Sequence, residues 1–325
     1  MVSQISGDIE DRDSIGPTIS VVVPYHNESE TIRTTLELLA TQTYLPREVI
    51  LVDSASTDDS FEVVENWMVK NGPRFDGIRF ENINTGTCVP SSSKNAGIRL
   101  ARGEVVALMD CGLLFDVDWL EKQVEFMRSG AFEVVSGGCV LKGENWIDVA
   151  AVAQTYGYKK FNPCMPSSLV KRTVFEDIGL FLEGRRSAYD VDWANRLKTE
   201  AVRRGINENV IVRYNGVNYA DTFQNLWRKT LIYAENTVGI HGYPYPYFYL
   251  LLILATATTA WVYPPAVAVL CLLYFAVRGI VVPLKKSENL AIFRERPSSF
   301  WTLPLIGLII DLGKLAGYTK GFLKR

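Results

Sequence analysis

One carboxylate in this 325-residue sequence stands where chemistry on a bound ligand is expected. Asp110 follows Val105–Met109, a continuous apolar run typical of a strand that is buried on both faces. In an open parallel sheet, ligands bind beyond the carboxyl ends of the strands. An acid at that place can hold a metal ion, a ribose hydroxyl or both, although Asp110 could also merely cap the turn that follows it.

The composition argues against several other kinds of site. His26 and His241 are far apart, so a metal site built on a histidine cluster is not expected, and any metal would be a hard ion with oxygen ligands. The five cysteines are scattered without a Cys-x-x-Cys spacing, which fits a reducing compartment better than a disulfide framework. A net charge of −2 argues against a nucleic-acid partner.

The elements that must position Asp110 form a series of strand–helix units. Strands are expected at Ile19–Val23, Val49–Val52, Ile78–Phe80 and Val105–Met109. Helices are expected around Leu36–Gln42, after an N-cap at Ser56 or Thr57, and at Asn95–Ala101 beyond a polar loop at Asn82–Ser93. Such alternation predicts an α/β fold with a mostly parallel, doubly wound sheet.

Four of these runs together resemble family-2 glycosyltransferases of the GT-A fold, which is Rossmann-like. They are residues 21–28 (Val-Val-Val-Pro-Tyr-His-Asn-Glu), 51–58 (Leu-Val-Asp-Ser-Ala-Ser-Thr-Asp), 94–104 (Lys-Asn-Ala-Gly-Ile-Arg-Leu-Ala-Arg-Gly-Glu) and 107–110 (Ala-Leu-Met-Asp). Their order and gaps match over about Ile19–Trp119, and the resemblance continues more loosely beyond. It implies a GT-A catalytic domain at residues 18–220. Residues 1–17 are expected to be a disordered leader, because Met1–Gly16 is polar and acidic without an apolar core.

The resemblance also implies which residues bind the nucleotide-diphosphate sugar donor. Pro24, Tyr25, Glu28 and Asp53 match the positions that hold the base and ribose. Lys94 stands where the family usually has an arginine and should face the nucleotide, together with Asp110. For Glu28, the alternative is an acid near a helix N-terminus that the helix dipole stabilises.

The sequence departs from the family at the metal site. The family usually shows Asp-x-Asp, whereas this chain has Asp110-Cys111-Gly112, so the second acid is missing. Asp110 could hold a divalent ion, Mg²⁺ or Mn²⁺, with water and phosphate as the other ligands. Cationic side chains could instead replace the ion at the leaving diphosphate. The third possibility is an inactive relative.

The second half is expected to supply the acceptor side. After a strand at Phe132–Ser136, the helix that contains residues 189–197 resembles the family's Glu-Asp-x-Asp/Glu motif, with Tyr189 in place of the Glu. The resemblance implies that Asp190 is the general base. Asp192 and Arg196 lie four residues apart, so they should pair on one face of this helix, which is expected to be solvated.

A composition shift beyond Tyr214 indicates a membrane-associated module. Residues 221–246 contain an amphipathic stretch, Phe223–Asn236, in which Trp227 and Arg228 favour a membrane interface. The alternative is a surface helix packed on the catalytic domain.

Residues 247–325 are expected to be membrane-associated helices. Tyr247–Val282 is apolar with prolines in its middle, which predicts a hairpin or one kinked span, and a hairpin returns the basic residues after it to the side of the catalytic domain. Phe300–Ile310, with Leu312–Leu323, is expected to be interfacial or re-entrant. A soluble, buried hairpin is the remaining alternative.

The sequence therefore predicts an inverting glycosyltransferase at the cytoplasmic face of the cell membrane. Its expected partners are a nucleotide-diphosphate sugar, a glycan or lipid-linked acceptor, and membrane lipids, which fits polysaccharide synthesis for the cell envelope. One rival is a polyprenyl-phosphate sugar synthase, whose acceptor is the lipid phosphate. The other is a catalytically silent protein of the same fold that binds nucleotide or acts as a scaffold.

Overall fold

The computed structural model of this protein describes residues 16–75, 77–215, 221–240 and 243–324. Most of the leader expected at residues 1–17 lies outside this part, as do His241 and the expected domain boundary near residue 220.

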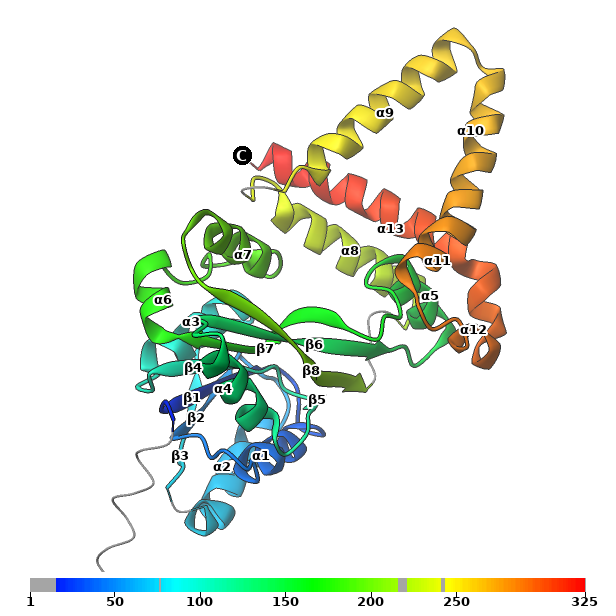
Figure 1. Cartoon of the computed structure of the whole chain (residues 1–325). Coiled ribbons are helices and arrows are strands. Elements are labelled where there is room, and N and C mark those ends of the chain that lie inside the picture. Colours follow the sequence, from blue (N-terminus) through cyan, green and yellow to red (C-terminus); the bar gives the residue numbers. More distant parts are fainter. Residues whose placement is uncertain (1–15, 76, 216–220, 241–242, 325) are drawn as a thin grey trace, which may run out of the picture.

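The described strands form one eight-stranded sheet in the order β3-β2-β1-β4-β7-β6-β8-β5 (Figure 1). The strands are β1 (Ile19–Tyr25), β2 (Glu48–Asp53), β3 (Arg79–Asn84), β4 (Val105–Leu108), β5 (Leu113–Leu114), β6 (Val134–Lys142), β7 (Asn162–Lys171) and β8 (Arg204–Asn215). Strands β1 to β4 pair in parallel, while β7 is antiparallel to both β4 and β6, β8 is parallel to β6, and β5 is antiparallel to β8. The predicted α/β fold class is confirmed, with a mixed sheet beyond β4.

Helices cover both faces of the first half of the sheet, which explains its continuous apolar runs. These helices are α1 (Ile32–Ala40), α2 (Ser60–Asn71), α3 (Pro90–Leu100), α4 (Trp119–Ser129), α6 (Arg172–Ile178) and α7 (Tyr189–Thr199). In β1, Val21 and Val23 belong to the core that contains α1, α2 and α4, while Val22 belongs to the core of α3, α6 and α7. Because successive side chains of a strand point to opposite faces, a strand between two helix layers is apolar throughout.

Two helix starts differ from the sequence prediction. α2 begins at Ser60 and not after Ser56 or Thr57, because Asp53 and Asn27 accept the backbone N–H groups of those two residues at 3.0 and 2.7 Å. α3 begins at Pro90, inside the expected loop, since proline has the φ that the first helical position needs.

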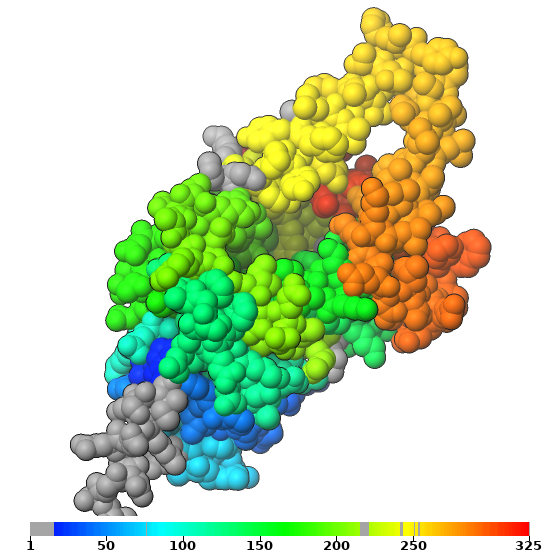
Figure 2. Space-filling model, viewed as in Figure 1, coloured from blue at the N-terminus to red at the C-terminus, as the bar shows by residue number. Residues whose placement is uncertain are grey.

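Six further helices follow in the C-terminal region. They are α8 (Phe223–Thr237), α9 (Tyr245–Val262), α10 (Pro265–Ala276), α11 (Val282–Lys286), α12 (Ile292–Glu295) and α13 (Pro297–Leu323), with a π-helical turn (Val277–Val281) between α10 and α11. α9 and α10 meet at Pro264 and diverge from it as two arms that stand clear of the body of the protein (Figures 1 and 2).

Three helices of the described chain are long and apolar enough to cross a membrane: Tyr245–Val262, Pro265–Lys286 and Pro297–Leu323. The apolar pieces that the sequence analysis separated, 300–310 and 312–323, are thus parts of one 27-residue helix that continues past Pro304.

One carboxylate joins the three apolar helices to one another, and one glutamine joins them to the sheet domain. Asp311 of α13 accepts hydrogen bonds from the hydroxyls of Tyr249 (2.6 Å) and Tyr274 (2.8 Å) and forms an ion pair with Arg278. Gln154 donates to the backbone oxygen of Arg278 at 2.6 Å, and it ends α5 (Trp146–Gln154), a helix buried from Ile147 onward. A buried charge is stable only when it is paired, so these contacts hold the hairpin against α13 and α5.

α13 packs closely along α8 because small residues face it. A Cβ atom at Gly317 would lie 2.7 Å from the Cβ of Ala234 and would clash with the backbone oxygen of Leu231. Leu226 of α8 is fully buried in a core that α5 and α13 share. α8 therefore lies between the sheet domain and α13 (Figure 1). One face of α8 thus packs on the catalytic domain, as the surface-helix alternative expected.

Gly317→Ala should destabilise the protein, because the added methyl group must push α13 away from α8. Overpacking of this kind typically costs about 1–3 kcal/mol. The measurement is thermal unfolding of the full chain in detergent. Gly72→Ala is the matched control, since a Cβ there meets nothing within 4 Å and its φ of −45° suits alanine. Equal stability of the two variants would contradict close packing of α13 on α8.

Candidate functional site

A cavity of about 340 Å³ lies at the carboxyl ends of β1 and β4. Its lining comes from the loops of the first half of the chain and from the second half, including α8. The lining residues are Pro24, Tyr25, His26, Glu28, Ser54, Cys88, Pro90, Lys94, Asp110, Cys111, Arg186, Tyr189, Tyr214 and Tyr233. Five residues predicted to bind the donor are thus brought together: Pro24, Tyr25, Glu28, Lys94 and Asp110.

Asp110 is held on both of its oxygen atoms. Its Oδ1 forms an ion pair with Lys94 of α3, whose side chain is 3% exposed, and its Oδ2 accepts a hydrogen bond from the Tyr214 hydroxyl at 3.0 Å. Burial and the nearby carboxylate of Asp110 keep the pKa of Tyr214 well above its usual value, so its hydroxyl remains a neutral donor. Both partners of Asp110 thus come from other elements, α3 and β8, and not from the turn after Asp110.

The loop after β1 forms one wall of the cavity. The Tyr25 hydroxyl donates to Asn82 at 2.8 Å, and the backbone N–H of Glu28 donates to the Ser60 hydroxyl at 2.7 Å. The carboxylate of Glu28 accepts from the Thr31 hydroxyl, and burial raises its pKa. Glu28 also lies just before α1, and the backbone N–H groups at the start of this helix donate to its backbone oxygen. Its position thus agrees both with donor binding and with an acid near a helix N-terminus.

Asp53 lies behind the wall of the cavity. It is 1% exposed, and its carboxylate accepts from the Asn84 side chain at 2.6 Å and from the Ser56 backbone at 3.0 Å. The neighbouring Ser54 does line the cavity. A direct contact between Asp53 and a nucleotide therefore stays a prediction.

Asp190 lies in the first turn of α7, directly after Tyr189 of the lining. Burial raises its pKa; two backbone N–H groups and the charge of Lys94 oppose this shift, and the charge of Asp110 adds to it. Asp190 is thus within electrostatic reach of the Lys94–Asp110 ion pair.

Asp192 and Arg196 form the expected pair, with 2.9 Å between Arg196 Nε and Asp192 Oδ2. The expected solvated face is wrong for Asp192, which is 6% exposed. Arg196 also donates to the backbone oxygens of Ile178 (2.6 Å) and Leu180 (2.7 Å). The pair therefore fixes the turn before α7 and does not face the cavity.

Some predicted residues are not brought to the cavity, while others were missed. Trp227 and Arg228 are exposed on α8 and do not line it, whereas Tyr233 of the same helix does. Tyr214 and Arg186 were not predicted as binding residues. Arg186 precedes α7, and no pattern in the sequence signals that it reaches the cavity.

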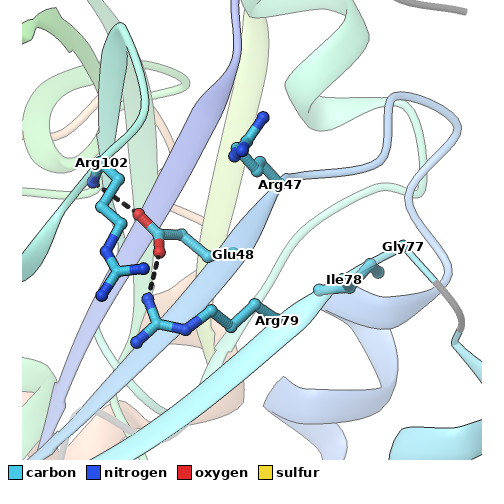
Figure 3. A pocket seen from close by; sticks show the side chains of 6 residues that line it. All are labelled: Arg47, Glu48, Gly77, Ile78, Arg79 and Arg102. Carbon is cyan, nitrogen blue, oxygen red and sulfur yellow. Dashed lines mark hydrogen bonds and ion pairs between the residues drawn. The ribbon is translucent and has the colours of Figure 1, made fainter.

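A second cavity, of about 440 Å³, lies at the opposite end of the strands (Figure 3). Glu48, at the start of β2, accepts there from Arg79 Nη1 at 2.8 Å, from the Arg102 backbone at 2.6 Å and from the Ser20 hydroxyl at 2.6 Å. No residue predicted for donor or acceptor binding lines it. A buried carboxylate with three donors is a structural feature of this end of the sheet.

The described side chains do not form a metal site of their own. Among the residues that the structure describes, no group of three His, Cys, Asp or Glu side chains is arranged so that it could hold a metal ion. Divalent ions such as Mg²⁺ take several oxygen ligands. One carboxylate with water and phosphate ligands can be enough for Mg²⁺, but both oxygen atoms of Asp110 are already bound, one of them by the positively charged Lys94 ammonium group and the other by the Tyr214 hydroxyl. The residues present therefore do not fit a resident divalent ion.

Comparisons with known proteins agree with this architecture. Residues 20–179 match glycosyl transferase family 2. Glycosyltransferase AglE of Haloferax volcanii is 26% identical over 193 residues, which cover 55% of this chain and 61% of that protein. Glycosyltransferase GlyG of Streptococcus pneumoniae is 31% identical over 119 residues, which cover 37% of this chain and 38% of that protein.

A solved structure shares the fold over nearly the whole chain. It is the mannosyltransferase PcManGT from Pyrobaculum calidifontis, in complex with GDP-Man and Mn²⁺. The TM-score is 0.57 at 21% sequence identity, and the match covers 96% of this chain and 89% of that one.

Proposed function

This chain belongs to glycosyl transferase family 2 through residues 20–179, and from that premise we propose that it transfers a sugar from a nucleotide-diphosphate donor to a hydroxyl group of a glycan or lipid-linked acceptor. The observation that carries the proposal is the cavity at the carboxyl ends of β1 and β4, where Tyr25 and Glu28 face the Lys94–Asp110 pair. Ligands of open α/β sheets bind at this edge.

The proposed reaction is a single in-line displacement with inversion at the anomeric carbon. The acceptor oxygen forms the new bond to that carbon while the bond from carbon to the β-phosphate oxygen breaks. Asp190 takes the acceptor proton, and the nucleoside diphosphate leaves with the electron pair of the broken bond. The place of Asp190 beside the lining residue Tyr189 supports this role.

The donor is proposed to bind through Pro24, Tyr25, Glu28 and Asp53 on the nucleoside side, with Lys94 near its phosphates. A divalent ion at Asp110, as the family resemblance implied, meets a donor set that does not fit it. PcManGT, which shares the fold, was solved with Mn²⁺. Because Lys94 and Tyr214 already bind both oxygen atoms of Asp110 here, we assign the binding steps to the side chains of this chain alone.

We further propose that the catalytic domain works at the cytoplasmic face of a cell membrane, in contact with membrane lipids. The three apolar helices support membrane association. Arg278, Lys285 and Lys286 follow the second arm of the hairpin, near α5 of the sheet domain, and cytoplasmic loops are rich in such residues.

The first test is binding of UDP, GDP and dTDP to the full chain in detergent, measured by calorimetry. One of them should bind, and the matching nucleotide sugars should then be offered with candidate acceptors to detect transfer. Nucleotide binding without transfer or hydrolysis would favour the silent relative. A polyprenyl-phosphate sugar synthase, whose phosphate acceptor needs no general base, would transfer sugar without Asp190.

A further inference from the structure

We propose that this protein binds the donor diphosphate without a divalent ion, and that Arg186 supplies, with Lys94, the positive charge that the ion supplies in metal-dependent glycosyltransferases. The inference rests on the proposed function, because it concerns the same donor site. It adds a binding residue, Arg186, and a class of ligand group, the diphosphate.

The first step of the argument is the state of Asp110. Its Oδ1 pairs with Lys94 and its Oδ2 accepts from Tyr214, so a metal ion would have to displace a buried ammonium group or a hydroxyl. The next residues, Cys111 and Gly112, offer no second carboxylate. In this arrangement Asp110 positions the Lys94 ammonium group at the cavity wall.

The second step is the charge of Arg186. This side chain lines the cavity, and its Nη1 donates to the backbone oxygen of Cys88 at 3.3 Å. Arg186 forms no ion pair with a carboxylate anywhere in the described residues, whereas the charge of Lys94 is partly offset by Asp110. Arg186 is therefore the lining cation whose full charge is available to an incoming anion. Its planar guanidinium group suits two phosphate oxygens at once.

The third step is that the segment around Arg186 is anchored on two sides. The backbone N–H groups of Gly184 and Arg185 donate to the hydroxyls of Ser92 (3.2 Å) and Ser91 (2.9 Å) at the start of α3. On the other side, the Ser187 hydroxyl donates to the backbone oxygen of Tyr233 in α8 at 3.2 Å. These contacts hold the backbone of residues 184–187 beside the cavity before a ligand arrives, which lowers the entropy lost on binding.

The consequence is chemical. When the bond to the anomeric carbon breaks, the β-phosphate oxygen gains negative charge. Preorganised cations at that place stabilise the charge in the transition state as well as in the bound donor. Arg186 reaches the cavity from the loop before α7, and Lys94 reaches it from α3. The diphosphate would therefore lie between these two side chains.

The test is calorimetry of the full chain with UDP, GDP and dTDP, first in EDTA and then with Mg²⁺ or Mn²⁺. The nucleotide that binds should bind equally well in all three conditions. Arg186→Gln should weaken that binding about tenfold or more, the scale of a hydrogen bond to a charged group. Arg186→Lys should recover part of the loss, and the nucleoside without phosphates should bind the variants and the unaltered protein alike.

Arg213→Gln is the matched control, because Arg213 adjoins Tyr214 in β8 but pairs with Asp116 outside the cavity. It should leave the affinity unchanged. The affinity of Asp110→Asn should be the same in EDTA and in Mn²⁺, as in the unaltered protein, whereas a metal-holding Asp110 would require that Mn²⁺ strengthens binding to the unaltered protein and not to the variant. Binding that EDTA abolishes and Mn²⁺ restores, or an Arg186→Gln variant with unchanged affinity, would overturn the inference while leaving donor binding intact. No binding of UDP, GDP or dTDP in any condition would instead refute the proposed function itself.

Discussion

Asp190→Asn should slow sugar transfer by at least ~10²-fold, the scale of general-base catalysis, with almost unchanged affinity for the nucleotide. An acceptor hydroxyl is a poor nucleophile until its proton leaves. Asparagine keeps the shape of the side chain but cannot accept that proton. The measurement is the transfer rate at saturating donor, with calorimetry of the nucleotide on the same preparation.

The pH dependence provides a second measurement of the same role. Burial raises the pKa of Asp190, so the carboxylate takes up a proton at higher pH than an exposed aspartate, whose pKa is about 4. The rate should therefore fall as the pH drops through this raised pKa, and the acidic limb of the profile should disappear in Asp190→Asn. A raised pKa in the folded state also means that ionisation at neutral pH opposes folding, so the variant should unfold at the same temperature or higher.

Asp192→Asn is the comparison that separates chemistry from structure. Asp192 pairs with Arg196, which holds the backbone oxygens of Ile178 and Leu180. Asp192→Asn should therefore lower the thermal stability of the protein but leave most of its transfer rate. If Asp192→Asn were the inactive variant, or Asp190→Asn transferred sugar at a near-normal rate, Asp190 would not be the base.

The second large effect concerns the membrane. The full chain should stay with membranes through a high-salt wash and should need detergent for release. Arginine in place of Leu251, Leu252, Leu272 and Leu273 should move most of the protein to the soluble fraction. Each arginine near the centre of a spanning helix costs roughly 2.5–3.5 kcal/mol in insertion, so four of them oppose insertion by roughly 10–14 kcal/mol.

These four leucines suit the test because they are exposed in the fold, with Leu251 at 65% and Leu272 at 71%. Their replacement should therefore not disturb the protein interior. Val69→Arg and Leu45→Arg are the matched controls, since both are exposed apolar residues of the sheet domain and should leave membrane binding unchanged. A full chain that is freely soluble without detergent would refute membrane association. A four-arginine variant that stays in the membrane would refute insertion of the hairpin.

A simple truncation near residue 219 is a poor substitute for this experiment. It would remove α8 and α13, which cover the apolar residues of α5. It would also remove Tyr233 from the wall of the cavity. Loss of function in such a fragment would report an opened core and not the absence of a membrane.

The sequence by itself determined the features that depend on neighbours along the chain. Continuous apolar runs predicted β1, β2 and β4, because a strand covered by helices on both faces is apolar at every position. The four-residue spacing of Asp192 and Arg196 predicted their pair, because such residues meet on any helix. Asp110 was expected at a strand end for the same local reason.

Only the tertiary structure decided which elements meet at the cavity. Tyr214 reaches Asp110 from a position 104 residues further along the chain, and Tyr233 arrives on a helix packed against α13. Asp53, which the resemblance placed on the nucleotide, is buried and bonded to Asn84 of the neighbouring strand β3. Periodicity reports which face of an element is apolar, but not which other element covers that face. The partners of Asp110 and the approach of Arg186 therefore followed from the packing of α3, α7 and α8 around the sheet.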